Sequence, residues 1–321
     1  MNMLQEAQQI IDKCLGTLKE SVEGKRVTFL CGNAGPLALA AVIYSVLGEQ
    51  KKSQKYLNYL LEMVGLVDNQ ELPDEMLYGR SGYLFSLLFV RKEVGATSVP
   101  DCLIRKVVIL ILRSGQYLSR ETRSRCPLMY EWHGKRYYGA AHGLSGIYTV
   151  LLQSQALNPQ ELRELVKPSI DYLLDKMFPS GNFPSSQGND NDKLVHWCHG
   201  IPGVIYLLLL AYAQWKEEKY MNAAIKGGEC IWERGLLRKG SGLCHGSAGN
   251  GYGLVHLYQA TQDTKWLYRA AMFGLHCSQF KEYFHRLADS PLSLFEGLAG
   301  TVHYLFQLKN PESAKFPGFL V

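Results

Sequence analysis

Two short stretches of the sequence place a cysteine and a histidine directly before a glycine. The first pair is Cys198-His199 and the second is Cys244-His245. Thiolate sulfur and imidazole nitrogen are ligands that zinc binds in tetrahedral geometry. The pattern therefore predicts a soft-metal site whose first-choice ligands are Cys198, Cys244 and His245. His199 is a fourth candidate.

Three interpretations of this site follow from the residue types. Free cysteine is commonly buried, so the first is a pair of buried thiols beside hydrogen-bonded histidines. The second is a structural zinc with four protein ligands, and the third is a zinc with three ligands and an open position. A thiol substrate at an open position would be deprotonated by the cation. It would then be a nucleophile at neutral pH.

Four other residues could act on or bind a substrate. His142 precedes a glycine without a cysteine beside it, and a pKa near 6.5 suits proton transfer at pH 7, so it is a candidate general acid or base. A core histidine is the alternative. Glu75 could orient His142 or carry a proton, unless it is simply solvated. Lys239 and Arg80 could hold a substrate carboxylate, with ordinary surface positions as the alternative.

A Gly-x-x-Gly sequence followed by an apolar run recurs six times, at a spacing of roughly 45 to 65 residues that suits one helical hairpin per repeat. The first glycines are Gly32, Gly79, Gly143, Gly200, Gly246 and Gly297. The residues directly before them are Cys31, Tyr78, His142, His199, His245 and Glu296. Equivalent positions of a closed repeat ring face one opening. We therefore expect these six side chains to converge.

The elements that would position these residues are two kinds of helix. Nearly continuous apolar runs predict buried inner helices at 37–47, 83–90, 147–152, 204–212, 252–258 and 301–308. Amphipathic spacing predicts outer helices at 4–22, 51–64, 102–118, 162–177, 219–232 and 266–280. No stretch alternates convincingly with the period of a strand. The prediction is an all-α protein, a closed α/α toroid in a single domain over residues 1–321, with an open solenoid as the alternative.

Composition narrows the functional classes. Hydrophobic residues make up 47% of the chain, enough for a large core, and the net charge of +5 comes without a dense basic block, which argues against nucleic acid. The N-terminus lacks a secretory signal pattern. Apolar runs are shorter than the roughly 20 residues that span a bilayer. Eight scattered cysteines in a long chain do not suggest a disulfide framework, so we expect a reduced, cytoplasmic protein.

The stretches around the repeated glycines resemble a known family. They lie at 29–37, 76–80, 139–143, 194–200, 242–250 and 293–297. The chain resembles the eukaryotic LanC-like proteins, relatives of the bacterial lanthionine synthetase cyclases, from Lys25 through Phe319. The resemblance implies an α/α toroid of helical layers with a catalytic zinc.

Carried over position by position, the resemblance implies zinc ligands at Cys198, Cys244 and His245. It makes His142 the proton-transfer residue and Lys239 a residue that binds glutathione. His199 falls at a position near the metal that is not a ligand. Glu75 falls where the bacterial cyclases have an aspartate.

The activity implied by the resemblance is addition of glutathione to dehydroalanine or dehydrobutyrine residues, which form when phosphoserine or phosphothreonine loses phosphate. The thiolate would attack the β-carbon and His142 would protonate the α-carbon. The partners would be glutathione and dehydroamino-acid-containing proteins, while peripheral membrane association and oligomeric state stay open. The second hypothesis is a non-catalytic glutathione-binding or signalling scaffold. A carbohydrate-processing enzyme ranks last, because it would need two opposed carboxylates and the ring offers Glu296 with Glu75 set back.

The sequence departs from the family at its start. Family members carry an additional N-terminal segment with a first Gly-x-x-Gly and an arginine of the glutathione pocket, and this sequence contains neither. Residues 4–22 look like the outer helix of that layer. We therefore expect six recognisable repeats and an incomplete first layer.

Overall fold

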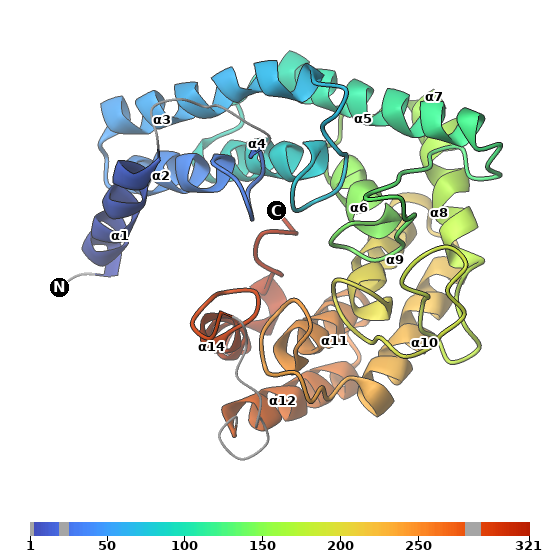
Figure 1. Ribbon diagram of the computed structural model, residues 1–321. Helices are drawn as coiled ribbons and strands as arrows, with labels where there is room; N and C mark the ends of the chain where they lie inside the picture. Colours follow the sequence, from blue (N-terminus) through green and yellow to red (C-terminus); the bar gives the residue numbers. More distant parts are fainter. Residues whose placement is uncertain (1–2, 19–25, 280–289) are drawn as a thin grey trace. The chain divides into compact units, whose positions relative to one another are not determined.

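The computed structural model describes residues 3–18, 26–279 and 290–321 of the chain (Figure 1). Within these ranges the chain forms helices joined by loops, and no β-strand occurs. Two isolated β-bridges pair Trp132 with Lys135 and Tyr137 with Ser186. The all-helical prediction is confirmed for the described part of the chain.

The chain divides into two compact units. Unit 1 comprises Met1–Tyr130, Val150–Leu165 and Gly318–Val321, and unit 2 comprises Glu131–Thr149 and Val166–Pro317. Each unit is described separately below. The single domain expected from the sequence stays a prediction.

Unit 1 is built around two buried helices, α2 and α4. Helix α2 packs against α1, α3 and α4, and α4 packs against α5. Helices α3 and α5 lie alongside α2 and α4 (Figure 1). The helices of this unit are α1 (Met3–Thr17), α2 (Ala34–Val46), α3 (Gln50–Glu62), the 3-10 helix η1 (Met63–Asp68), α4 (Arg80–Val94), α5 (Asp101–Glu121) and α7 (Pro159–Glu161).

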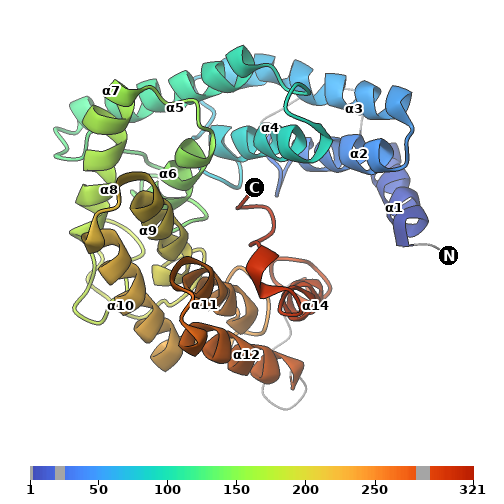
Figure 2. The same cartoon turned by 180° about the vertical axis from the view of Figure 1, so that it is seen from behind.

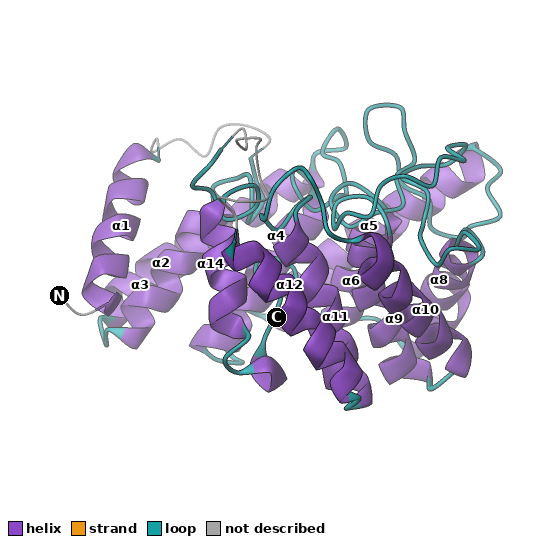
Figure 3. Cartoon of the chain, turned by 90° about the horizontal axis from the view of Figure 1, so that it is seen from below, coloured by secondary structure: helices purple, strands orange, loops and turns teal. Residues whose placement is uncertain are grey.

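Unit 2 repeats this arrangement with α9, α11 and α14 as neighbours. Helix α11 contacts α9, α10, α12 and α14, and α9 contacts α10 (Figure 2). The long loops of this unit lie at one end of its helices (Figure 3). Its helices are α8 (Lys167–Leu174), α9 (Ile201–Trp215), α10 (Glu218–Arg234), α11 (Ser247–Thr261), α12 (Thr264–Ser278), α14 (Leu298–Gln307) and the 3-10 helix η3 (Pro311–Ser313). Helix α6 (Leu144–Gln153) and the π-helical turn η2 (Leu162–Val166) cross from one unit to the other.

Inner and outer helices differ in burial as their sequences predict. In α9 an unbroken run is buried from Ile201 through Leu208. In α5 the buried positions instead follow helical spacing, beginning Ile104, Val107 and Val108, and form one stripe. The alternation of inner and outer helices is thus confirmed within each unit.

Helix ends differ from the prediction by a few residues. The outer helix predicted at 162–177 begins earlier, because the side chain of Asn158 accepts the N–H of Glu161 and forms a capping box. It ends earlier as well, at Leu174. The predicted ends at 19–22 and at 280 lie outside the described residues.

The second glycine of the motif makes the same close backbone contact in five of the six repeats. A Cβ added there would lie only 1.9 to 2.2 Å from the carbonyl oxygen six residues earlier, so a side chain would force the start of the helix away from its own loop. The contact occurs in five repeats: Gly35 with Phe29, Gly82 with Met76, Gly203 with Trp197, Gly249 with Leu243 and Gly300 with Leu294.

Candidate metal centre

The three first-choice ligands come together in unit 2. One ligand atom from each of Cys198, Cys244 and His245 lies within 4.8 Å of the other two. Two atoms that each lie about 2.3 Å from a tetrahedral zinc are about 3.8 Å apart. The observed spacing fits that arrangement. Within the part of the chain that the structure describes, no other group of three such side chains comes this close.

Backbone hydrogen bonds join the two ligand loops. The N–H of Cys198 donates to the carbonyl of Cys244 at 3.2 Å, and the N–H of Cys244 donates to the carbonyl of Phe295 at 2.7 Å. The fully buried Asn250 of α11 donates from Nδ2 to the carbonyl of Val195 at 2.8 Å. The candidate ligands are therefore held by an extended hydrogen-bond network rather than by isolated turns.

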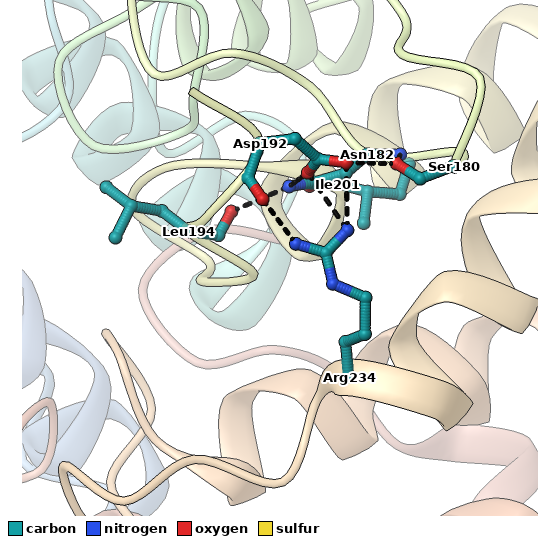
Figure 4. Close-up of polar contacts among 6 residues, drawn as sticks. All are labelled: Ser180, Asn182, Asp192, Leu194, Ile201 and Arg234. Carbon is teal, nitrogen blue, oxygen red and sulfur yellow. Dashed lines mark hydrogen bonds and ion pairs between the residues drawn. The ribbon is translucent and has the colours of Figure 1, made fainter. Parts of the chain in front are cut away.

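A polar network ties the Cys198 loop to α10 (Figure 4). Nη1 of Arg234 donates to both carboxylate oxygens of Asp192, at 3.0 and 2.9 Å, and Nη2 donates to its carbonyl at 2.7 Å. The same carboxylate accepts from Ser180 Oγ at 2.6 Å and Asn182 Nδ2 at 2.8 Å. Burial raises the pKa of Asp192, but these hydrogen bonds outweigh it and hold the pKa below its usual value.

The thiols and the imidazole of the site share hydrogen bonds. The hydrogen bond with Cys198, and then burial, raises the pKa of the Cys244 thiol. The hydrogen bond with Cys244 raises the pKa of His245, although burial acts in the opposite direction. A coordinated cation reverses the first effect, because a thiol bound to a metal is deprotonated. The donor set is therefore suited to a cation.

Two further histidines beside the ligands are neutral at pH 7. Burial lowers the pKa of His199 to about 4, and electrostatic interactions with neighbouring basic side chains add to the effect. Burial, with the charge of Lys239, lowers the pKa of His196 to about 4. The ring of His196 lies 6.1 Å from that of His245. Among the described residues, the buried Nδ1 of His199 has no hydrogen-bond partner.

His142 belongs to an aromatic cluster in the same unit. The indole of Trp132 stacks on its imidazole, with ring centroids 3.9 Å apart and planes 6° apart. The ring of Tyr137 lies 5.9 Å from that of His142 and 5.5 Å from that of His199. Tyr137 thereby links the candidate acid to the histidine beside the metal ligands.

A tight hairpin presents Trp132 to His142. Trp132 and Lys135 exchange both backbone hydrogen bonds, at 2.9 and 3.1 Å. His133 and Gly134 between them have φ values of 48° and 70°. Positive φ at both central residues is typical of a type I′ turn, which fixes the course of a two-residue hairpin.

Two charged residues interact electrostatically with histidines of the candidate metal centre. Lys239 is exposed in the loop before Cys244, and its positive charge contributes to the lowered pKa values of His196 and His199. Glu296 is half-buried, and its negative charge contributes to the raised pKa of His245. The structure thus places Lys239 within electrostatic reach of the candidate metal centre.

The other two predicted site residues lie in unit 1. The carboxylate of the buried Glu75 accepts the N–H of Leu77 at 2.9 Å and the N–H of Tyr78. The buried Arg80 forms an ion pair with Asp74 at 2.8 Å. The guanidinium of Arg80 also donates to the backbone carbonyls of Val67, Asn69 and Leu72. The functional roles of Glu75 and Arg80 stay predictions.

Sequence reasoning missed three residues of the candidate site. One of them is His196, which stands two positions before Cys198. Trp132 and Tyr137 lie outside the Gly-x-x-Gly pattern, in the segment before Gly139. A positive-φ turn sequence, His133-Gly134, is the signal that could have pointed to a hairpin there.

A separate pocket of 760 Å³ lies within unit 1, between α4, α5 and the segment after α6. Its lining includes Arg91 and Arg105, which pair with Asp101 and Glu161 respectively, at 2.5 and 2.6 Å. None of the predicted site residues lines this pocket. Both arginines of its wall therefore already have carboxylate partners.

The sequence matches the model of the lanthionine synthetase C-like protein family over residues 1–321. The chain belongs to the LanC-like family. It is 47% identical over 323 residues to the glutathione S-transferase LANCL1 of Danio rerio, covering 99% of this chain and 79% of the relative. It is 37% identical over 328 residues to the LanC-like protein GCL1 of Arabidopsis thaliana, covering 97% and 74%.

The structure of this LanC-like chain resembles that of nisin cyclase. The TM-score is 0.58 at 15% sequence identity, and the likeness covers 96% of this chain and 94% of that one. At that identity the likeness shows the fold alone, and it confirms the predicted fold class, the α/α toroid. All eight cysteines are free thiols. None of the described helices is both long and apolar enough to cross a membrane.

Proposed function

We propose that this LanC-like chain is a zinc-dependent transferase that adds glutathione to dehydroalanine and dehydrobutyrine residues of proteins. The name of its Danio rerio relative, a glutathione S-transferase, supports glutathione as the thiol. The observation that carries the proposal is the close approach of two sulfur atoms and one imidazole nitrogen in unit 2.

Cys198, Cys244 and His245 would hold the zinc ion. Three protein ligands leave one tetrahedral position open, as in catalytic zinc sites. Zinc bound there would supply the positive charge that keeps a thiol substrate deprotonated at neutral pH. The unpartnered Nδ1 of neutral His199 supports a site that accepts a polar ligand beside the ion.

Lys239 would bind a carboxylate of glutathione. It is exposed, and its ammonium charge acts on His196 and His199 beside the metal ligands. Glutathione carries two carboxylates, so a positive charge at this position would favour its binding over that of an uncharged thiol. This contribution would weaken as salt concentration rises.

His142 would complete the reaction as a general acid. When the thiolate sulfur bonds to the β-carbon, the electron pair of the carbon–carbon double bond moves toward the carbonyl and an enolate forms. Protonated His142 donates to the α-carbon and recovers its proton from solvent. The thiol proton is released to solvent, so the sum is addition of S–H across the double bond. A general acid of this kind contributes about 10²- to 10⁴-fold.

Metal analysis tests the first half of the proposal. The purified protein should contain one zinc per chain, and Cys198→Ala should lose it, because two protein ligands do not hold zinc tightly. Cys277→Ala is the matched control, since Cys277 is a buried cysteine of α12 outside the donor group. Stoichiometric zinc in the Cys198→Ala protein would show that the ligands are misassigned.

A rate assay tests the second half. The zinc-loaded protein should add glutathione to a dehydroalanine peptide faster than the uncatalysed reaction, and His142→Ala should lower kcat by at least about a hundredfold. His276→Ala on α12 is the control. If glutathione binds but neither protein accelerates the reaction, the chain is the glutathione-binding scaffold rather than an enzyme.

A further inference from the structure

One backbone hydrogen bond closes the loop before the inner helix in five of the six repeats. The residue after the first glycine donates its N–H to the carbonyl seven residues earlier, at 2.8 to 3.2 Å. The pairs are Asn33 with Arg26, Arg80 with Pro73, Leu144 with Tyr137, Ser247 with Gly240 and Leu298 with Pro291. The loop that carries Cys244 and His245 is closed in this way.

The loop that carries Cys198 is closed differently. Its equivalent donor is the N–H of Ile201, which donates to Oδ1 of Asn182 at 2.9 Å. Its equivalent acceptor is the carbonyl of Leu194, which accepts from Nδ2 of the same Asn182 at 3.0 Å. The side-chain amide of Asn182 thus stands between the two backbone groups that bond directly in the other repeats (Figure 4).

The inserted amide coincides with a changed backbone at the first glycine. Gly200 has a φ of 117°, whereas Gly79, Gly246 and Gly297 have values between −126° and −110°. A Cβ on Gly200 would lie 2.3 Å from the carbonyl oxygen of Leu194 and 2.8 Å from Oδ1 of Asn182. The loop is therefore wider here by one amide group, and glycine is required at its turn.

Asn182 is itself firmly held. It is fully buried, and Nδ2 also donates to Asp192, whose carboxylate receives Arg234 from α10. The amide therefore uses its acceptor and both of its donors, which fixes its orientation. A buried amide whose donors and acceptor are all in hydrogen bonds is a rigid spacer, because any rotation would leave polar groups unpaired.

We propose that Asn182 is the positioning residue that places Cys198 for metal binding. Cys198 lies within the loop that the amide widens, between Leu194 and Ile201. Its sulfur must come close to the sulfur of Cys244 and an imidazole nitrogen of His245, which stand on a directly closed loop. The Asn182 amide therefore determines how the Cys198 loop is displaced relative to the loop that carries Cys244 and His245. This inference rests on the proposed metal centre and adds a residue to it that touches no ligand atom.

Asn182→Ala removes the spacer but leaves the two backbone groups free to bond directly, as in the other repeats. The variant should therefore fold, with Cys198 displaced from its partners. Residues that orient metal ligands typically contribute 10- to 100-fold in affinity, and we expect a loss of about that size. The measurement is zinc affinity by competition with a chromophoric chelator. Asn189→Ala is the matched control, since Asn189 is an amide of the same loop that bonds to Ser185.

Cobalt provides a readout that loss of stability alone would not change. With cobalt(II) in place of zinc, the thiolate charge-transfer band of the folded Asn182→Ala protein should fall in intensity or shift. Asp192→Ala, which keeps both backbone bonds of Asn182, should weaken zinc binding by a smaller factor. Wild-type zinc affinity and an unchanged cobalt spectrum in Asn182→Ala would overturn the inference alone. A wild-type protein that binds no zinc would overturn the metal centre and the inference together.

Discussion

The stack between Trp132 and His142 allows a specific kinetic prediction. Trp132→Ala removes an indole that lies parallel to the imidazole with centroids 3.9 Å apart. Such aromatic pairs contribute roughly 0.5 to 1.5 kcal/mol beyond the area they bury. If that energy holds His142 in its productive orientation, kcat should fall about two- to tenfold, since 1.36 kcal/mol corresponds to a factor of ten. Trp132 does not belong to the metal donor group, so zinc content should not change.

The assay is glutathione addition to a dehydroalanine peptide, with kcat and KM determined separately and zinc measured on the same samples. Trp132→Phe should recover most of the rate, because a phenyl ring can still stack. Trp232→Ala is the control, since Trp232 is an exposed tryptophan of α10 in the same unit. An unchanged kcat in Trp132→Ala, or a loss of rate that follows a loss of zinc, would refute the argument.

Three further predictions concern stability and substrate binding. Gly249→Ala places a Cβ 1.9 Å from the carbonyl of Leu243 and should lower the urea unfolding free energy by at least about 2 kcal/mol; Gly65→Ala, with open space around it, should change it little. Burial lowers the pKa of His256 from 6.5 to about 4, so below pH 6.5 the unfolded chain binds a proton that the folded chain does not. The free energy of unfolding, measured at pH 7.0 and 5.5, should therefore fall less on acidification in His256→Phe than in wild type. The difference should be roughly 1.4 kcal/mol per pH unit below 6.5; equal losses would contradict this. Lys239→Ala should raise KM for glutathione several-fold with kcat kept, and the difference should shrink at high salt; a salt-independent KM would argue against a charge contact.

Much of the fold and the core of the site could be predicted from local sequence signals. The apolar run at 204–212 lies within α9, and the amphipathic run at 102–118 lies within α5. Hydrophobicity and its period are properties of the sequence itself, so they predict which helix faces become buried. The proximity of Cys198 to Cys244 could also be predicted, because each stands at the same position of a repeat.

What escaped prediction depends on contacts between distant parts of the chain. Nothing local in the sequence indicates that the side chain of Asn182 bonds to the backbone of both Leu194 and Ile201. The stack of Trp132 on His142 likewise joins residues ten positions apart in the sequence. Side chains that bond to backbone groups ten or more residues away leave no periodic trace in a sequence.

The glycine contact at the start of five inner helices has a consequence for how this scaffold can vary. The contact requires only that the second glycine has no side chain, because its partner is a backbone carbonyl. The residue before the first glycine takes no part in this contact. That position holds a thiol in Cys31, a phenol in Tyr78 and a carboxyl in Glu296. Architecture and reactivity are thus assigned to neighbouring but separate residues. Mutation or design can therefore replace the reactive side chain of one repeat without changing the inner helix that follows it.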